Sequence, residues 1–531
     1  MSKRNISQKW RVLGCLVFFA AAVLFVTGTL DSSLAAGTKL YQGTPAKYVF
    51  YLIGDGMGIP QRTAAGKYAE KRLLIDSFPA QGVTTTYAAN QFITDSAASA
   101  TSLASGLKTN VGVVGMDANG KAVKTVAEMA KEKGMKVGII SSVSIDHATP
   151  ASFYAHVPSR GQYYDIDIAL AESGFDFFGG GGLKDPTDKK KKSKNYQGDA
   201  LELAKKNGYK IVTQKDAFMR LTPADGKILA WNDWLQDSGA MPYEMDTRDE
   251  DITLAEFTAK AVELLDNPKG FFIMVEAGKI DWACHANDGT AAIYDTFAFD
   301  EAVRVAYDFA KKHPQDTLIV VTGDHECGGM TLGFAGTKYA SNYEILGKQK
   351  ISFTKFDQEV FGPYKKKAAG KADFEHVQGM ITEHFGLKFV PETAMAAKTT
   401  ESAGAYSSAK GGDPMILEPH EIAQIKDAFN RSMGGEKEMA KEAQTYLLYG
   451  GYEPLTVTLT HILNQKAGIG WTSYSHTGVP VTTSGYGVGA DIFNGYYDNT
   501  EAALKVMSIM GIEAKPHYVK VQSTHKLAAN F

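Results

Sequence analysis

Short runs of almost continuous apolar, β-branched and aromatic residues constrain the fold of this chain more than any other feature. They occupy residues 47–53, 136–141, 270–276 and 317–322. Such runs are typical of strands that are covered on both faces, as in parallel sheets. Helical patterns lie between them, for example at 122–133 and 254–266. The alternation predicts an α/β fold with a mostly parallel central sheet sandwiched by helices.

Acidic residues and a histidine follow three of these runs. Asp55 follows the first, Glu276 closes the third with Asp281 just beyond it, and Asp324 and His325 follow the fourth. Open α/β sheets bind their ligands at the carboxyl ends of the strands. We therefore expect these side chains to meet in one site.

Two of these groups have a spacing that suits metal ligands. Asp281 and His285 are four residues apart, so a helix would place both side chains on one face. Asp324 and His325 are adjacent in a turn after a strand. Each pair alone is also typical of an ordinary polar surface, and the prediction of a metal site rests on their occurring together.

Ser96 begins a segment of small residues, 96–102, that is predicted to be helical. The N-terminus of a helix presents backbone N–H groups and the positive end of the helix dipole to an anion. A serine hydroxyl is a weak nucleophile and needs a base or a metal ion to activate it. A helix-capping serine in a tightly packed segment is the alternative interpretation.

The composition is that of an ordinary globular protein. The chain has 531 residues, of which 44% are hydrophobic and 22% charged, with a net charge of −3. This nearly neutral balance gives no reason to expect binding to nucleic acid. The length allows one large α/β domain with insertions, or two to three domains.

The N-terminus has the pattern of an export signal. Basic residues precede an apolar run over 12–30, and small residues at 33–36 offer a cleavage site. We therefore predict a signal peptide over residues 1–36 and a periplasmic or extracellular location. The apolar run is just long enough to span a bilayer, so an uncleaved membrane anchor is the alternative.

The α/β alternation is less clear between about 331 and 470. We predict a core formed by residues 37–335 and 456–531, with a large insertion over 336–455 that precedes His476. One helix is predicted within it, with Asp373 as its N-cap and Gly386 at its end. The segment 396–412 is rich in Gly, Ser, Ala and Thr and is predicted to be a surface loop.

Several segments resemble those of the alkaline phosphatase family and occur in the same order. They are 54–58, 94–101, 147–150, 156–160, 275–276 with 281–285, 322–325 and 476–478. Together they extend over most of the chain after residue 36. The resemblance implies an alkaline-phosphatase-like fold, hydrolysis of phosphate monoesters through a phosphoserine at Ser96, and a homodimer.

The resemblance also assigns a role to each matching residue. Ser96 is the expected nucleophile, and Arg160 is expected to bind the phosphoryl oxygens in bidentate fashion. Two zinc ions and a third ion at a site of oxygen ligands that suits magnesium are implied. The implied ligands are Asp281, His285 and His476 for the first zinc, Asp324, His325 and Asp55 for the second, and Asp55, Thr149 and Glu276 for the third ion.

Two positions depart from the best-known bacterial pattern of the family. His147 stands where an aspartate often supports the third metal, and Trp282 stands where a lysine or histidine often lies beside the phosphate. The third ion is then either bound differently or is zinc. Cys327 is expected beside Asp281, where it would tune the first zinc. Cys284 and Cys327 are either paired or two buried thiols.

Other functions remain as alternatives. A sulfatase needs a modified Cys or Ser followed by Pro-x-Arg, which residues 97–99 do not supply. A phosphodiesterase of the same superfamily is an alternative, although Arg160 suits a phosphoryl group with free oxygens better than a diester. A non-catalytic exported protein that binds phosphate or metal is another, but it would not need Ser96. The expected partners are small phosphate monoesters.

Overall fold

The computed structural model describes residues 38–189, 191, 193–368, 373–390, 413–434 and 442–519. The predicted signal peptide (1–36) and the predicted loop over 396–412 lie outside these residues. Within the part of the chain that is described, no helix has both the length and the apolar character needed to cross a membrane.

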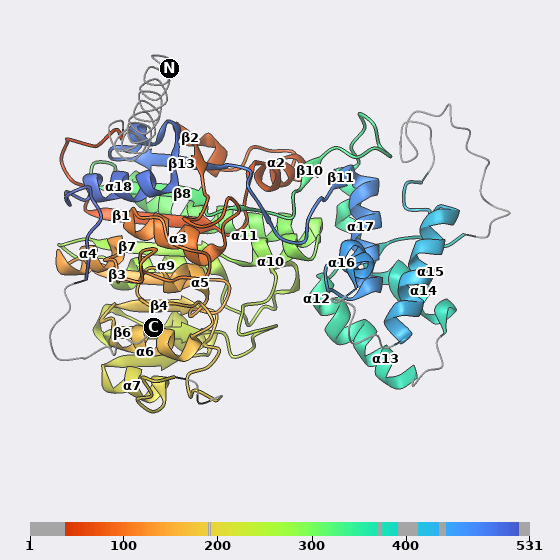
Figure 1. The fold of residues 1–531 in the computed structure, drawn as a ribbon, viewed down its shortest axis with the longest axis horizontal. Helices are drawn as coiled ribbons and strands as arrows, with labels where there is room; N and C mark the ends of the chain where they lie inside the picture. The colour runs from red at the N-terminus through yellow and green to blue at the C-terminus, as the bar shows by residue number, and fades with distance from the viewer. Residues whose placement is uncertain are drawn as a thin grey trace, which may run out of the picture.

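Ten strands form one central sheet (Figure 1). Their bounds are β1 Tyr48–Gly54, β2 Ala80–Thr85, β3 Lys136–Ser141, β4 Phe177–Gly180, β5 Tyr209–Val212, β6 Lys227–Trp231, β7 Phe271–Ala277, β8 Thr317–Gly323, β13 Val481–Gly487 and β14 Gly495–Asp498. The order across the sheet is β14-β2-β13-β8-β1-β7-β3-β4-β6-β5. Only β13 runs antiparallel to its neighbours, β2 and β8. The prediction of a mostly parallel sheet is confirmed, and the four predicted strands are its adjacent members β8, β1, β7 and β3.

The central strands are buried on both faces, which explains their continuous apolar runs. In β1, Val49 and Tyr51 pack into one core, and Phe50 and Leu52 pack into the core on the opposite face. The first face is covered by α3 Ser96–Ser105, α4 Val126–Glu132, α5 Ala148–Ala151, α6 Tyr163–Glu172, α7 Ala200–Lys206 and α18 Asn499–Ile509. The second is covered by α8 Lys215–Met219, α9 Leu254–Leu265, α10 Lys279–His285 and α11 Gly289–Lys312. Helices therefore sandwich the sheet, as predicted.

A third apolar core lies beside the sheet and contains Phe356, Phe385, Phe429 and Leu459. The helices on this side of the molecule gather at the right of Figure 1. They are α12 Phe353–Lys355, α13 Gly362–Ala368, α14 Phe374–Phe385, α15 Pro419–Gly434, α16 Ala443–Tyr449 and α17 Pro454–Ala467, and α2 Ile59–Tyr68 packs against the same core. Most of this core comes from the predicted insertion, and α17 joins it from the segment that follows. The boundaries 336–455 stay a prediction.

The predicted helix in this region is α14. The Asp373 side chain accepts a hydrogen bond from the His376 N–H at its start, and Gly386 adopts the left-handed conformation at its end. This amphipathic helix is thus bounded by the residues that its sequence indicated.

Two short antiparallel strand pairs lie outside the central sheet. Strand β9, Glu326–Cys327, pairs with β12, His476–Thr477. Strand β10, Thr331–Leu332, pairs with β11, Ile469–Gly470. The first pair brings a segment from the far end of the chain to the end of β8, which matters for the site.

Candidate active site

The carboxyl ends of three central strands bring the predicted acidic residues together. Strand β1 pairs in register with β7 and β8, so Ile53 lies opposite Glu276 and Gly54 lies opposite Gly323. Asp55 therefore comes next to Asp324 on one side and Glu276 on the other. All three carboxylates are fully buried. The parallel register thus explains why carboxylates from distant segments share one edge of the sheet.

Ser96 is the first residue of α3, and this helix begins at the same edge of the sheet. Asp95 caps the helix, its side chain accepting a hydrogen bond from the Ala98 N–H at 3.0 Å. The Ser96 side chain is almost fully buried, and its Oγ lies 3.3 Å from Nε2 of His325. The predicted nucleophile therefore touches a predicted metal ligand.

His325 is the centre of one compact group. Its Nε2 lies 3.2 Å from Oδ1 of Asp55 and 3.3 Å from Oδ2 of Asp324. The other Asp324 oxygen accepts hydrogen bonds from the backbone N–H groups of Gly56 and His325. These bonds orient the Asp324 carboxylate, so its second oxygen faces the group. Asp281 also lies within ligand distance of Asp55 and His325.

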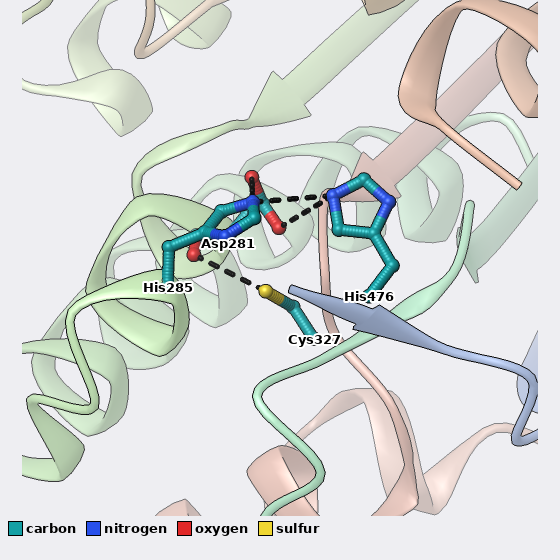
Figure 2. A group of neighbouring side chains, drawn as sticks. All are labelled: Asp281, His285, Cys327 and His476. Atoms are coloured by element: carbon teal, nitrogen blue, oxygen red, sulfur yellow. Dashed lines mark hydrogen bonds and ion pairs between the residues drawn. The ribbon is translucent and has the colours of Figure 1, made fainter. Parts of the chain in front are cut away.

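A second group consists of Asp281, His285, His476 and Cys327 (Figure 2). Asp281 and His285 lie one turn apart on α10, as predicted, and His285 Nε2 is 3.3 Å from Asp281 Oδ2. His476 Nε2 is 3.2 Å from His285 Nε2 and 3.6 Å from Asp281 Oδ1. Ligand atoms of a tetrahedral zinc site lie about 3.3 Å from one another. The three separations therefore fit one zinc ion.

Backbone carbonyls hold both imidazoles of this group in one tautomer. Nδ1 of His285 donates to the carbonyl of Tyr474 at 2.6 Å, and Nδ1 of His476 donates to the carbonyl of Thr94 at 2.8 Å. Each Nε2 then carries a lone pair directed at the other, an arrangement that suits two metal ligands.

The pairing of β9 with β12 places His476. His476 lies opposite Cys327 in this pair. Cys327 directly follows His325 and Glu326 in the sequence, so His476 comes close to the end of β8. The Glu326 carboxylate accepts hydrogen bonds from Thr477 Oγ1 and from the amide of Gln61. It ties β12 and α2 to the end of β8. Glu326 was not among the predicted site residues, although its position next to Asp324 and His325 is a signal that sequence analysis can use.

A third group lies on the other side of Asp55. Asp55, His147 and Glu276 have ligand atoms within 4.8 Å of one another. Thr149 Oγ1 is 3.4 Å from Asp55 Oδ2, and Ser141 donates a short hydrogen bond to Glu276. Burial and the guanidinium of Arg160 lower the pKa of His147 to about 3, so its imidazole is neutral. A neutral imidazole is available as a ligand here in addition to the oxygens.

Gly56 allows the groups to approach one another. Its φ is +69°, and a Cβ at this position would lie 2.8 Å from the Asp281 Cα and 2.9 Å from the Asp281 Oδ1. Only glycine fits without displacing α10 from the end of β1.

Arg160 contacts Asp95, the residue before Ser96, and is held from two sides. One guanidinium nitrogen is 3.0 Å from Oδ2 of Asp95, and the other is 3.2 Å from Nε2 of His147. Burial raises the pKa of Asp95, but Arg160 and the backbone N–H donors lower it by more, so this carboxylate is charged. Asp95 therefore orients the planar guanidinium group of Arg160. The sequence did not indicate this role of Asp95.

Trp282 and Cys327 lie at the border of the site. The Trp282 ring packs edge-on against His147, with ring centroids 5.8 Å apart. Cys327 Sγ is 3.7 Å from the backbone oxygen of Asp281, not from its carboxylate. Cys284 and Cys327 are both buried and free, which decides between the two alternatives for this pair.

The chemistry of these groups fits divalent cations. Asp55, Glu276, Asp281 and Asp324 each have one buried oxygen without a hydrogen-bond partner among the described residues. Burial, with the Asp55 carboxylate adding to it, raises the pKa of Glu276 and Asp324 well above the usual range. Several unpaired carboxylates this close together are costly unless cations balance them. The donor sets thus match bound metal ions.

Fold and site together define an α/β enzyme in which a serine, an arginine and groups of side chains able to bind metal meet at the ends of parallel strands. Comparison with known proteins names the family. The sequence profile of the alkaline phosphatase family matches residues 46–512. The chain therefore belongs to the alkaline phosphatase family and is a phosphatase that acts on phosphate monoesters.

Individual relatives agree with this assignment. The chain is 29% identical to alkaline phosphatase 4 of Bacillus subtilis over 96% of this chain and 98% of the relative. It is 35% identical to the alkaline phosphatase of Escherichia coli over 53% of this chain and 70% of the relative. The solved structure of a cold-active alkaline phosphatase from Shewanella is 27% identical, with a TM-score of 0.68, over 87% of this chain and 99% of the other.

Proposed function

We propose that this phosphatase hydrolyses phosphate monoesters through a phosphoserine at Ser96, assisted by two zinc ions and a third ion. The contact between Ser96 Oγ and His325 Nε2, 3.3 Å apart, carries this proposal. It places a nearly buried hydroxyl at the edge of a ligand group in which Asp55 and Asp324 each have one oxygen without a hydrogen-bond partner among the described residues. A protein that only binds phosphate has no use for a hydroxyl in this position.

The residues of the site divide the work of a two-step transfer. Arg160, aligned by Asp95, would bind two phosphoryl oxygens with its planar fork. The N-terminal N–H groups of α3 face the same anion. Ser96 Oγ then attacks phosphorus while the ester P–O bond breaks; the Ser96 hydroxyl proton passes to solvent, and the departing alcohol oxygen takes a proton from solvent. Water next attacks phosphorus, the Ser96 Oγ–phosphorus bond breaks, a proton of that water passes through solvent to Ser96 Oγ, and inorganic phosphate leaves.

The proposed ligands are those that the family resemblance implied. Asp281, His285 and His476 would hold one zinc, and Asp55, Asp324 and His325 the other. Asp55, Thr149 and Glu276, with His147 beside them, would hold the third ion. Bound there, the metals would supply charge stabilisation for the attacking and leaving oxygens and lower the pKa of water.

Solved structures with this fold support a third ion site. Two variants of the alkaline phosphatase from the Antarctic bacterium TAB5, in which a histidine was replaced by Glu or Asp, are described with Mg bound in the M3 site. They are 24% identical to this chain, with TM-scores of 0.60 and 0.59. We propose magnesium for the third site, with zinc as the alternative because His147 adds a softer donor.

Export and dimer formation are part of the same proposal. The sequence pattern of residues 1–36 supports export to the periplasm or the exterior, and the family resemblance supports a homodimer. The net charge of −3 gives no reason to expect binding to nucleic acid.

The test is hydrolysis of p-nitrophenyl phosphate at alkaline pH by the wild type, Ser96→Ala and Ser102→Ala. Ser102 lies on the same helix and its hydroxyl donates to the Ala98 carbonyl, so Ser102→Ala is the matched control. We expect Ser96→Ala to lower kcat/KM by more than about a thousandfold. When the substrate carries a labelled phosphoryl group, acid quenching should trap labelled phosphoserine in the wild type and in Ser102→Ala, and not in Ser96→Ala. Full activity of Ser96→Ala overturns the phosphoserine mechanism. Preferential hydrolysis of bis-p-nitrophenyl phosphate would favour a phosphodiesterase, and binding of phosphate without turnover would favour a non-catalytic protein.

A further inference from the structure

A cavity of about 400 Å³ adjoins the proposed active site. Aromatic side chains form much of its wall: Tyr243, Trp282, Phe353 and Tyr452. His285, a proposed zinc ligand, lines the same cavity. Ligand cavities of this size are typically lined by aromatic residues with a few polar groups.

The cavity touches the site at two points. Through His285 it borders the zinc group, since His285 Nε2 is 3.2 Å from His476 Nε2. Through Trp282 it borders the phosphate-binding side, since Trp282 packs against His147 and His147 contacts Arg160. A phosphoryl group bound between Ser96 and Arg160 would therefore have the mouth of this cavity beside it.

Both parts of the protein build the cavity. Trp282 and His285 come from α10 of the sheet core, and Phe353 and Tyr452 come from the predicted insertion. The Phe353 ring packs edge-on against Tyr243 at 5.6 Å and against Tyr452 at 5.9 Å between centroids. The aromatic walls are thus a continuous set of contacts that crosses from one part to the other.

Buried carboxylates of the core hold the insertion's wall in place. Asp288, three residues after His285, accepts hydrogen bonds from the Phe353 N–H at 3.0 Å and from the Gln349 amide at 2.8 Å. Asp246 accepts the Ser352 N–H at 3.0 Å. The position of Phe353 is therefore set by the core, and the wall is preformed before a ligand arrives.

A buried ammonium group contacts two of the residues that line the cavity. Lys279 Nζ lies 3.6 Å from the centre of the Tyr243 ring and 3.4 Å from Oδ2 of Asp237, which also lines the cavity. The Asp237 carboxylate is thus paired with a cation, and this reduces its repulsion of a phosphate ester. Because the Asp237 charge is balanced by Lys279, the surface of the cavity is mainly aromatic.

We infer that this cavity binds an aromatic ring in the leaving group of the phosphate monoester. The inference rests on the proposed function and adds its substrate class. Ring faces and edges of four aromatic side chains offer stacked and edge-on contacts that an aliphatic alcohol cannot make. It also assigns a role to the insertion, which supplies two of the four rings. The ring has two chemical sources, an aryl ester or a nucleoside.

Two matched substrate pairs test this inference. Phenyl phosphate with methyl phosphate probes the aryl source, and adenosine 5′-monophosphate with ribose 5-phosphate probes the nucleoside source. The variants are Phe353→Leu and Tyr452→Leu, which keep an apolar side chain of similar bulk so that the wall can fold. Phe374→Leu is the control, because Phe374 packs against Phe389 and Phe429 in the third core and does not line the cavity.

We expect Phe353→Leu to lower kcat/KM about five- to tenfold for the ring-bearing member of at least one pair. The ringless member, and inhibition by inorganic phosphate, should change less than about twofold. The pair that responds identifies the source of the ring. If both members of each pair fall equally, or neither falls, or Phe374→Leu gives the same pattern, the inference is wrong while the phosphatase mechanism stands. Failure of the mechanism itself appears separately, as full activity of Ser96→Ala.

Discussion

His285 and His476 face each other with their Nε2 atoms 3.2 Å apart, although 191 residues separate them in the sequence. Two imidazoles this close, each with Nδ1 donating to a carbonyl, leave two lone pairs in contact. A metal ion bound by both nitrogens would remove that repulsion.

Removal of metal is expected to lower both activity and stability. A chelator leaves the buried oxygens of Asp55, Glu276, Asp281 and Asp324 without compensation, so the unfolding temperature should fall by at least about 5 °C. Scanning fluorimetry with and without chelator measures this. Adding zinc should restore the unfolding temperature and adding calcium should not, because imidazole ligands favour zinc. Ser96→Ala, which keeps the ligands, should show the same shift; an unchanged unfolding temperature would argue against bound metal.

Two substitutions of Arg160 are expected to weaken transition-state binding to different extents. Arg160→Lys keeps the charge but loses the fork, and should lower kcat/KM for p-nitrophenyl phosphate about tenfold. Arg160→Ala should lower it about a hundredfold, since charge-assisted hydrogen bonds contribute about 1.5–3 kcal/mol. Arg304→Ala is the control, because that exposed arginine pairs with Glu301 on α11 and is not among the proposed site residues. Equal activity of Arg160→Ala and Arg304→Ala would remove Arg160 from the mechanism.

Gly56→Ala tests the close approach of β1 to α10. The new Cβ would strain the positive φ and also collide with Asp281, so we expect a large loss of activity together with lower stability. Gly120→Ala is a matched control, since Gly120 has φ +78° but no atom within 4 Å of an added Cβ. It should cost only about 1–2 kcal/mol of stability and leave kcat/KM unchanged. Similar activity of the two variants would show that the approach is unimportant.

Asp357 is expected to make stability fall as the pH rises. Asp357 lies in the π-helical segment Phe356–Phe361. Burial raises its pKa, and Glu453 adds to this effect. The hydrogen bond from Thr456 and the charge of Lys365 lower the pKa by less, so it remains raised to about 7. The folded protein holds this proton more tightly than the unfolded chain. The contribution of Asp357 to stability is therefore complete below the ordinary aspartate pKa of 3.8 and is lost between there and about pH 7.

Asp357→Asn removes this dependence. The unfolding temperature of Asp357→Asn relative to that of the wild type should therefore be higher at pH 8 than at pH 5, because only the wild type must bury a charge at the higher pH. Thermal unfolding at both pH values gives the comparison. An equal difference at both pH values would contradict a raised pKa for Asp357.

Local pattern was sufficient for many elements of the fold. The apolar runs became β1, β3, β7 and β8 with ends shifted by at most one residue, because strands buried on both faces need continuous apolar sequence. The Asp281–His285 spacing became one face of α10. By contrast, β4, β5 and β6 were not predicted, and neither was the reversed direction of β13, since pairing partners are not visible in a local pattern.

The chemistry-bearing residue types, their strand-end positions and the family were all readable from the linear chain. Only the folded state decided how they meet: the pairing of β9 with β12 delivers His476, Asp95 aligns Arg160, and Phe353 closes an aromatic cavity against Tyr243. The reason is physical. Periodicity and burial act over a few neighbouring residues, whereas contacts between distant segments depend on register and packing across the whole sheet.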